Sequence, residues 1–299
     1  MERNCCVTTG MFDGVHAGHR CLLRQLRDEA ARRGLSAVVV TFARHPKAVL
    51  SPDFRPRLLT TPEEKADLLR AEGVERVVTL DFTPQMAALT ARRFMQEVLA
   101  PLGARVLVAG YDHRFGHARA EGFSDYVAYG KDLGIDVVQA VELDSPAHVS
   151  SSVVRRLLSA GDVSAAARLL ERPYRLAGRV VPGRKQGRLL GFPTANLCPP
   201  ADKFVPALGV YACRAEAAGR LWPAMVNIGR RPTLDNGRDV SVEAHLLGYP
   251  AGEAGELYGE TVALHFVDRL RDEHRFPSTA ALCAQLADDA AQVRQILSL

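Results

Sequence analysis

The fold is decided by a glycine-rich stretch near the start of the chain, which reads Thr9-Gly10-Met11-Phe12-Asp13-Gly14-Val15-His16-Ala17-Gly18-His19-Arg20. The residues before it, Cys5-Cys6-Val7-Thr8, form an apolar, β-branched run that is typical of a buried strand. The apolar spacing after it, in Cys21-Leu22-Leu23-Arg24-Gln25-Leu26, predicts a helix. Parallel α/β proteins bind phosphates at such a strand, turn and helix start, because backbone N–H groups and the positive end of the helix dipole point outward there.

The residue types in this stretch suit contact with a phosphate. Gly10, Gly14 and Gly18 let the backbone approach a ligand closely. His16 and His19 share one face of the first helical turn, from which two imidazoles can donate hydrogen bonds and stabilise charge during phosphate transfer. Two alternatives stay open, a plain turn and a pair of metal ligands, although the sequence has no cysteine or carboxylate cluster to complete a zinc site.

The composition narrows the class of protein. A chain of 299 residues suggests two domains. No apolar run reaches the ~18 residues needed to span a bilayer, and the first residues show no signal-peptide pattern, so we expect a cytoplasmic protein with no membrane partner. The six cysteines form no Cys-x-x-Cys pair, which favours reduced and mostly buried thiols. The net charge of +4 comes with dispersed arginines, whereas a nucleic-acid-binding protein more often shows a basic stripe.

Strands and helices alternate through the first half of the chain. Further strands are predicted over residues 37–42, 76–80, 105–110 and 136–140, and helices over 62–72, 91–102 and 123–133. This alternation predicts a doubly wound parallel sheet, in which ligands bind beyond the carboxyl ends of the strands.

The second half of the chain has a different pattern of predicted secondary structure. Strand-like segments at 174–181, 209–215, 222–228, 240–247 and 261–266 follow one another with glycine and proline between them. One further helix is predicted over 279–297. Successive strands without crossover helices indicate an antiparallel barrel or sandwich, of which we favour a barrel with a C-terminal helix. We place the boundary at Arg172-Pro173, which gives domains of residues 1–171 and 172–299.

The stretch from Gly10 to His19 has the form Gly-x-Phe-Asp-Gly-Val-His-x-Gly-His. This form resembles the signature of the nucleotidylyltransferase superfamily, and in particular the FAD synthetase module of bacterial bifunctional riboflavin kinase/FAD synthetases. Gly110-Tyr111-Asp112-His113-Arg114-Phe115-Gly116 resembles that family's loop at the nucleotide and flavin site, and Val149-Ser150-Ser151-Ser152-Val153-Val154-Arg155 resembles its Ile-Ser-Ser-Thr-x-Ile-Arg motif. Taken alone, the first segment is typical of a polar turn and the second of a helix N-cap.

The resemblance implies roles for individual residues. It implies His16 and His19 as catalytic residues. It implies ATP and phosphate contacts by Gly10, Phe12, Asp13, Gly14, Gly18, Ser151, Ser152 and Arg155. It implies flavin contacts by Asp112, Arg114, Phe115 and Gly116.

A second pattern lies in the other half. Gly187-Arg188-Leu189-Leu190-Gly191-Phe192-Pro193-Thr194-Ala195-Asn196 resembles the riboflavin kinase signature, and further motifs follow in the family's order up to Leu270-Arg271-Asp272-Glu273-His274-Arg275-Phe276. The implied ATP contacts are Gly191, Pro193, Thr194 and Asn196, and the implied flavin contacts are Arg271 and Phe276. The family's His-Gly-Asp is here Pro182-Gly183-Arg184, and Gly248 stands where an Asp is common.

The chemistry of this second site can be argued from its residue types. The Thr194 hydroxyl and the Asn196 amide oxygen are hard ligands suited to Mg²⁺ bound together with ATP. Glu243 is a carboxylate that can take the proton of the riboflavin primary hydroxyl, although an exposed strand carboxylate is the simpler alternative.

The resemblance implies a bifunctional enzyme. Riboflavin is phosphorylated to FMN with ATP, and FMN is then adenylylated with a second ATP to give FAD and pyrophosphate. Riboflavin, FMN, FAD and ATP are the expected partners, Mg²⁺ the expected cofactor, and nucleic acid is not expected. Two alternatives are a nucleotidylyltransferase acting on a lipid head group or a pantetheine phosphate, and a flavin-binding regulator without turnover.

Overall fold

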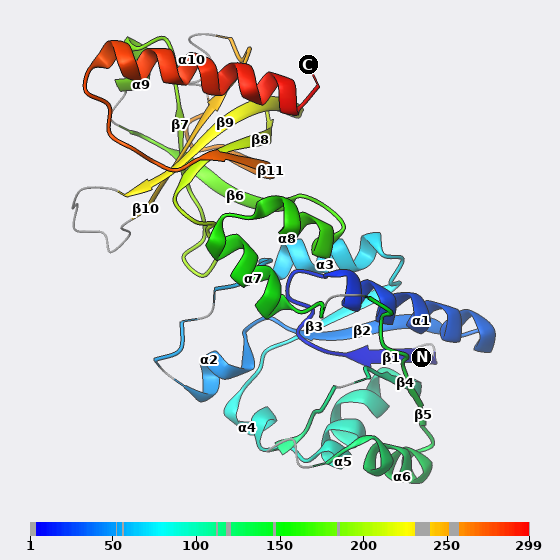
Figure 1. The fold of residues 1–299 in the computed structure, drawn as a ribbon. Coiled ribbons are helices and arrows are strands. Elements are labelled where there is room, and N and C mark those ends of the chain that lie inside the picture. Colours follow the sequence, from blue (N-terminus) through cyan, green and yellow to red (C-terminus); the bar gives the residue numbers. More distant parts are fainter. Residues whose placement is uncertain are drawn as a thin grey trace. The chain divides into compact units, whose positions relative to one another are not determined.

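The computed structural model describes residues 4–51, 53–55, 57–111, 113–117, 121–145, 148–183, 186–230, 240–250 and 257–298. The chain divides into two compact units, Met1–Ser151 and Ser152–Leu299, each with its own sheet (Figure 1). This division precedes the boundary predicted at Arg172-Pro173. Two helices account for the difference, α7 (Ser151–Ala160) and α8 (Val163–Leu170), because α8 packs against strands of the second unit.

The first unit contains the predicted parallel sheet, with strand order β3-β2-β1-β4-β5. Its strands are β1 (Cys5–Thr9), β2 (Ser36–Phe42), β3 (Arg76–Leu80), β4 (Ala104–Ala109) and β5 (Asp136–Gln139). The doubly wound sheet that the alternation predicts is thereby confirmed. β1 lies in the centre, so the glycine-rich stretch that follows it begins at the middle of the sheet's carboxyl edge.

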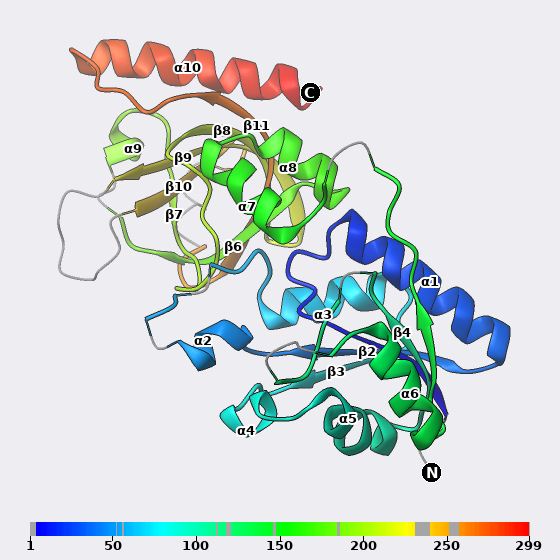
Figure 2. The same cartoon turned by 60° about the horizontal axis from the view of Figure 1, so that its bottom comes forward.

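Helices cover both faces of this sheet (Figures 1 and 2). On one face α1 (Ala17–Arg33) and α3 (Pro62–Ala71) bury Leu23, Leu26 and Leu69 against alternate strand residues. On the other face α5 (Ala91–Phe94) and α6 (Phe123–Leu133) bury Phe94 and Tyr126. The central strands are therefore apolar on both sides, which is why they appear in the sequence as continuous hydrophobic runs.

Several helices were not predicted from the sequence. They are α2 (Pro46–Leu50), α4 (Pro84–Ala87), α8 and α9 (Gln186–Leu189). The helix predicted over 91–102 begins as α5, continues as a π-helix over Met95–Leu99, and ends as a 3₁₀ turn over Ala100–Leu102. Pro101 has no N–H with which to continue an α-helical ladder, which is consistent with this irregular end.

The second unit is a closed antiparallel barrel with strand order β10-β7-β6-β11-β8-β9. Its strands are β6 (Tyr174–Val181), β7 (Ala195–Cys198), β8 (Gly209–Ala217), β9 (Arg220–Arg230), β10 (Val240–Leu246) and β11 (Thr261–Arg271). The predicted barrel is confirmed. β7 was not foreseen, and its four residues join β6 to β10.

The C-terminal helix α10 (Thr279–Ile296) lies along the barrel (Figure 1). Its Ala290 and Val293 pack against Val210, Ala212 and Met225 of the barrel wall. The short helix α9 (Gln186–Leu189) contains the first residues of the signature that begins at Gly187. Within the described ranges, no helix combines the length and the apolar character that a membrane crossing requires.

The cysteines are free thiols in this structure. Cys5, Cys6 and Cys213 are buried, Cys21 and Cys283 are partly buried, and Cys198 is exposed. Burial raises the pKa of the Cys6 thiol to about 12. These three buried side chains therefore serve as small core residues.

Candidate active sites

The loop between β1 and α1 is a strained turn. Phe12 and Val15 have φ values of 51° and 38°, a left-handed conformation that is unfavourable for residues with a side chain, and both side chains are buried. Such a residue costs roughly 1–3 kcal/mol and persists only where its surroundings hold it. The contacts around this loop must therefore supply that restraint.

Asp13 anchors the loop to the segment that precedes α3. Its carboxylate accepts hydrogen bonds from the backbone N–H of Leu59 (2.9 Å) and of Thr60 (3.1 Å), and from the Thr60 hydroxyl (3.2 Å). The Thr60 hydroxyl oxygen accepts in turn from the Gly14 N–H, at 3.1 Å. The Ser151 hydroxyl donates to the Asp13 carbonyl, at 2.9 Å. Asp13 and Ser151 therefore brace the loop, and their predicted phosphate contacts stay predictions.

The two histidines lie together at the N-terminus of α1, as their spacing predicts. His16 is the N-cap, and its Nδ1 accepts from the His19 N–H at 3.4 Å. The two rings stack with centroids 3.7 Å apart, and the Phe12 ring lies 5.1 Å from that of His19. Because a neutral imidazole that accepts at Nδ1 carries its proton on Nε2, His16 keeps one ring N–H as a donor.

Two of the glycines give these rings their space. A Cβ at Gly18 would lie 3.3 Å from the His16 ring, and one at Gly10 would lie 3.1 Å from the Phe12 ring. A side chain at either position would make the neighbouring aromatic ring shift by a few tenths of an ångström. Gly10 and Gly18 thus serve the local packing that orients His16.

The loop after β4 is fixed by aromatic packing. The Phe115 ring stacks on Tyr126 at 4.3 Å, and its backbone N–H donates to the Tyr126 hydroxyl at 3.1 Å. Gly116 has a φ of 91° and leaves no room for a Cβ beside Ala91. Arg114 is exposed. Phe115 and Gly116 thus anchor the loop, while the flavin contacts predicted for this segment stay predictions, with Asp112 outside the described residues.

The remaining predicted phosphate ligands lie at the start of α7. Ser152 is exposed and Arg155 is partly buried, and both belong to the second compact unit.

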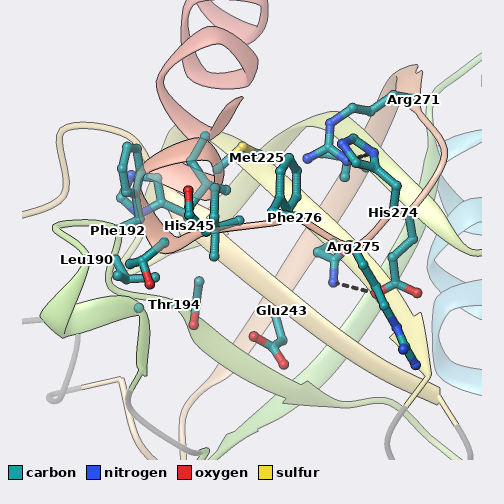
Figure 3. A pocket seen from close by; sticks show the side chains of 18 residues that line it. Leu190, Phe192, Thr194, Met225, Glu243, His245, Arg271, His274, Arg275 and Phe276 are labelled. Carbon is teal, nitrogen blue, oxygen red and sulfur yellow. Dashed lines mark hydrogen bonds between the residues drawn. The ribbon is translucent and has the colours of Figure 1, made fainter. Parts of the chain in front are cut away.

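A cavity of about 720 Å³ lies in the second unit, between the barrel wall and α10. Its lining contains four of the predicted residues, namely Thr194, Glu243, Arg271 and Phe276. Figure 3 shows Thr194 and Glu243 at the same edge of this cavity. The barrel thus brings together a motif hydroxyl and a carboxylate that are far apart in sequence.

Strand pairing explains how this edge is built. Glu243 on β10 pairs with Asn196 on β7 and with Asn227 on β9, so the three side chains point to one face of the sheet. Asn196 is buried, and Gly183 passes so close to it that a Cβ there would overlap the Asn196 amide. Of the described residues in the signature, Gly191 and Pro193 flank the cavity-lining residues Phe192 and Thr194.

His245 is a cavity residue that sequence reasoning missed. Its Nδ1 lies 2.8 Å from the Pro193 carbonyl, and its ring packs edge-on against Phe192 at 5.3 Å. Because a carbonyl can only accept, Nδ1 carries the proton. Burial lowers the pKa of His245 below its ordinary value, so the ring is neutral at pH 7. The signal was present, because alternation puts His245 on the same face of β10 as Glu243.

Arg271 lines the cavity and also holds α10 in place. Its Nε and Nη2 donate to the Asp289 carboxylate at 3.0 and 2.7 Å, and Asp289 is fully buried. Gln285 donates to the same carboxylate at 2.9 Å. The Arg271 guanidinium also lies over the Phe276 ring, 5.7 Å from its centroid. Asn227 and Glu273, which share a hydrogen bond of 3.4 Å, are further lining residues that were not predicted.

Comparison with known proteins matches both halves of the chain. The family model described as FAD synthetase matches residues 1–153, and the one described as riboflavin kinase matches residues 170–297. A Pseudomonas fluorescens protein named bifunctional riboflavin kinase/FMN adenylyltransferase is 38% identical over 298 residues, which cover 99% of this chain and 94% of that protein. The chain belongs to this bifunctional family.

Other relatives agree with this membership, and one solved structure with a different name has a similar fold. Proteins of the same name from Escherichia coli K12 and Bacillus subtilis are 36% and 33% identical, covering 100% and 97% of this chain and 94% and 91% of those proteins. A solved structure of a Streptococcus pneumoniae protein, named a macrolide-efflux protein, is 33% identical with a TM-score of 0.87, covering 98% of this chain and 97% of that one.

Membership of the bifunctional family confirms the predicted activity. The chain is a riboflavin kinase and FMN adenylyltransferase, and hence an ATP-dependent transferase of flavin cofactor synthesis. The alternative of a nucleotidylyltransferase for lipid head groups or pantetheine phosphate does not account for the riboflavin kinase match.

Proposed function

We propose that the two reactions take place in separate parts of the chain, adenylyl transfer in residues 1–171 and riboflavin phosphorylation in residues 172–299. The two family matches, which fall on either side of residues 154–169, support this division. The packing of α8 against the barrel strands β6 and β11 suggests that residues 152–171 stabilise the kinase part.

For the kinase reaction, Glu243 acts as the general base. It takes the proton from the primary hydroxyl of riboflavin as that oxygen attacks the γ-phosphorus of ATP. The new O–P bond forms FMN, the bond between the γ-phosphorus and its bridging oxygen breaks, and ADP leaves. The observation that carries this proposal is the cavity that brings Glu243 to the same edge as Thr194.

The donor set at this edge suits Mg²⁺. The Thr194 hydroxyl and the Asn196 amide offer hard oxygen atoms, and Asn196 pairs with Glu243 across the strands. Among the described residues, no cluster of three or more His, Cys, Asp or Glu side chains could hold a metal. Thr194 and Asn196 would therefore hold Mg²⁺ jointly with ATP, whose phosphate charge the ion neutralises when bound. Gly191 and Pro193 shape the backbone at this ATP site.

For adenylyl transfer, the phosphate of FMN is the nucleophile. It attacks the α-phosphorus of ATP, the bond to the leaving pyrophosphate breaks, and no protein nucleophile is needed. His16 and His19 at the N-terminus of α1 donate to the phosphates, supported by the outward-pointing amides of the helix start.

Further residues complete the two sites. ATP and phosphate contacts are proposed for Gly10, Phe12, Asp13, Gly14, Gly18, Ser151, Ser152 and Arg155. Flavin contacts are proposed for Asp112, Arg114, Phe115, Gly116, Arg271 and Phe276. We propose the cytoplasm as the location of both reactions.

The role of Glu243 is tested by Glu243→Gln, which keeps the shape of the side chain but removes its basicity. We expect turnover with riboflavin to fall about 10²–10⁴-fold, while riboflavin affinity, measured by flavin fluorescence, and FAD formation from supplied FMN persist. Glu216→Gln is the matched control, because Glu216 is a carboxylate on β8 whose side chain is 55% exposed. Near-normal kinase turnover in Glu243→Gln would refute the general-base role.

A further inference from the structure

Lys65 on α3 is a buried lysine outside the motifs that the family resemblance identifies. Only 3% of its surface is exposed, although lysines are almost never fully buried unless they are paired. Its Nζ donates to two carbonyl oxygens, that of Phe42 at the end of β2 (2.7 Å) and that of Met11 (3.1 Å). The ammonium therefore joins the helix, the neighbouring strand and the loop of the adenylyl-transfer site.

The Met11 carbonyl is the point at which the strained turn begins. It also accepts a hydrogen bond from the Thr41 hydroxyl, at 3.2 Å. The next residue is Phe12, with a φ of 51°, and the same turn leads to His16, the N-cap of α1. Lys65 and Thr41 together fix the peptide from which the orientation of the two histidines follows.

Charge gives Lys65 a role that a neutral donor such as Thr41 lacks. The carboxylate of Asp13, itself 4% exposed, acts on Lys65 from the loop. The groups of β2 near the ammonium are the Thr41 hydroxyl and the Phe42 carbonyl, and neither of them titrates. On the lysine's own helix Glu63 and Glu64 lie in the first turn, where Glu64 accepts from the Thr61 N–H.

Loss of the ammonium's charge would make the surroundings of the loop more negative by one unit. ATP and FMN both bring phosphate charge to this loop in the proposed reaction. A more negative loop should bind them less well, and a weaker bond to the Met11 carbonyl should loosen the histidines.

We propose that Lys65 is a positioning residue for adenylyl transfer, whose ammonium fixes the turn that carries His16 and His19 and offsets the charge of Asp13 near the bound phosphates. This inference rests on the proposed assignment of adenylyl transfer to the first part of the chain. It makes the protonation state of Lys65 part of the reaction.

The pH dependence separates this role from a purely structural one. Burial lowers the pKa of Lys65 from 10.5 to about 8, with the Asp13 charge opposing the shift. Between these two values the unfolded chain binds the proton and the folded chain does not, so stability gains from this group as pH rises. A structural role alone therefore predicts no loss of activity above pH 8, whereas the positioning role predicts that adenylyl transfer weakens there.

The test measures FAD formation from FMN and ATP with the full-length protein, from about pH 7 to about pH 10. We expect the KM for ATP of the unmodified protein to rise as pH passes about 8. Lys65→Met, which keeps a similar unbranched chain but no charge, should raise that KM about 10–100-fold at neutral pH and abolish its rise above pH 8. Thr41→Val is the matched control, because it removes the other donor to Met11 but no charge. It should keep the pH dependence.

Two results would overturn the proposal. In the first, Lys65→Met has the same KM for ATP and the same pH profile as the unmodified protein. In the second, Thr41→Val loses the pH dependence of the KM just as Lys65→Met does. Riboflavin phosphorylation in the same samples reports that the kinase part is folded, and far-ultraviolet circular dichroism reports whether helices of the first part such as α1, α3 and α6 are formed. Both should be unchanged. His19→Ala in the same assay distinguishes a wrong site assignment from a wrong role for Lys65. If His19→Ala retains FAD formation, the assignment of adenylyl transfer to this site fails. If His19→Ala loses FAD formation while Lys65→Met keeps a normal KM and pH profile, only the role of Lys65 is refuted.

Discussion

Replacing Asp289 should destabilise the kinase part of the chain strongly, because this carboxylate is the buried partner of Arg271. Asp289 is 0% exposed, while 18% of the Arg271 side chain is exposed. Asp289→Ala would leave the guanidinium without its two-point partner and would also remove the acceptor of Gln285. Removing one member of a buried ion pair typically costs 3–5 kcal/mol.

We expect Asp289→Ala to lower the free energy of unfolding by an amount near the lower limit of this range, about 3 kcal/mol. Arg271 keeps its bond to the Asp272 carbonyl, at 3.0 Å, and its partial exposure lets water solvate the freed charge. Asp288→Ala is the matched control, because Asp288 is the exposed neighbour on the same helix. It should change the free energy of unfolding by no more than ~0.5 kcal/mol.

The assay is urea unfolding followed by tryptophan fluorescence. The single tryptophan, Trp222, lies on β9, so its signal reports the unfolding of the barrel. If Asp289→Ala lowers the free energy of unfolding by less than ~1 kcal/mol, the buried ion pair does not stabilise the barrel as proposed, because exposed ion pairs contribute that little.

A double variant tests whether Arg271 also contacts the flavin. Arg271→Met combined with Asp289→Leu replaces the ion pair with apolar side chains, a change that is often neutral or stabilising. The free energy of unfolding should therefore recover from the Asp289→Ala value to near that of the unmodified protein. If Arg271 contacts the flavin, the KM for riboflavin should still exceed that of the unmodified protein. A KM that recovers together with stability would show that Arg271 acts only by holding α10.

Three further variants or conditions test the two sites. His19→Ala should lower FAD formation from FMN about 10²–10³-fold and leave FMN formation unchanged, as product separation would show; no loss of FAD would contradict the phosphate role. Gly183→Ala should lower riboflavin phosphorylation about 10²-fold, because the new Cβ displaces Asn196, and normal kinase turnover would count against that contact. The barrel should lose stability as pH falls below the ordinary His245 value of 6.5, because the unfolded chain then binds a proton that the folded chain does not; a Trp222 unfolding curve that is unchanged by acid would contradict this.

The parallel sheet could be predicted because its central strands β1, β2 and β4 are buried on both faces and therefore stand out as continuous apolar runs. The barrel was harder to specify, since alternating strands suit a sandwich as well. Its closure depends on β7, whose four residues Ala195-Asn196-Leu197-Cys198 are too few to show a strand pattern. The short helices α2 and α4 are single turns, which form from local contacts rather than from an amphipathic repeat.

The site residues could be foreseen where a motif carries them and not where tertiary contacts create them. Thr194 and Glu243 line the same cavity because β7, which directly follows Thr194, pairs with β10. Neither segment's sequence predicts this register. In sequence Lys65 looks like an ordinary exposed helix residue, and its burial follows from the packing of α3 on the loop. Asp289 likewise directly follows Asp288 on the same helix, and only the Asp288 carboxylate is exposed.

The separation of the two reactions is tested most directly by following two phosphates of ATP into the flavin products. ATP labelled at the γ-phosphate marks FMN formed from riboflavin, and ATP labelled at the α-phosphate marks FAD formed from FMN. With Glu243→Gln we expect the γ-label to be lost from the product and the α-label to be retained when FMN is supplied. With His19→Ala we expect the reverse. Equal loss of both labels in either variant would contradict the assignment of the two reactions to separate sites.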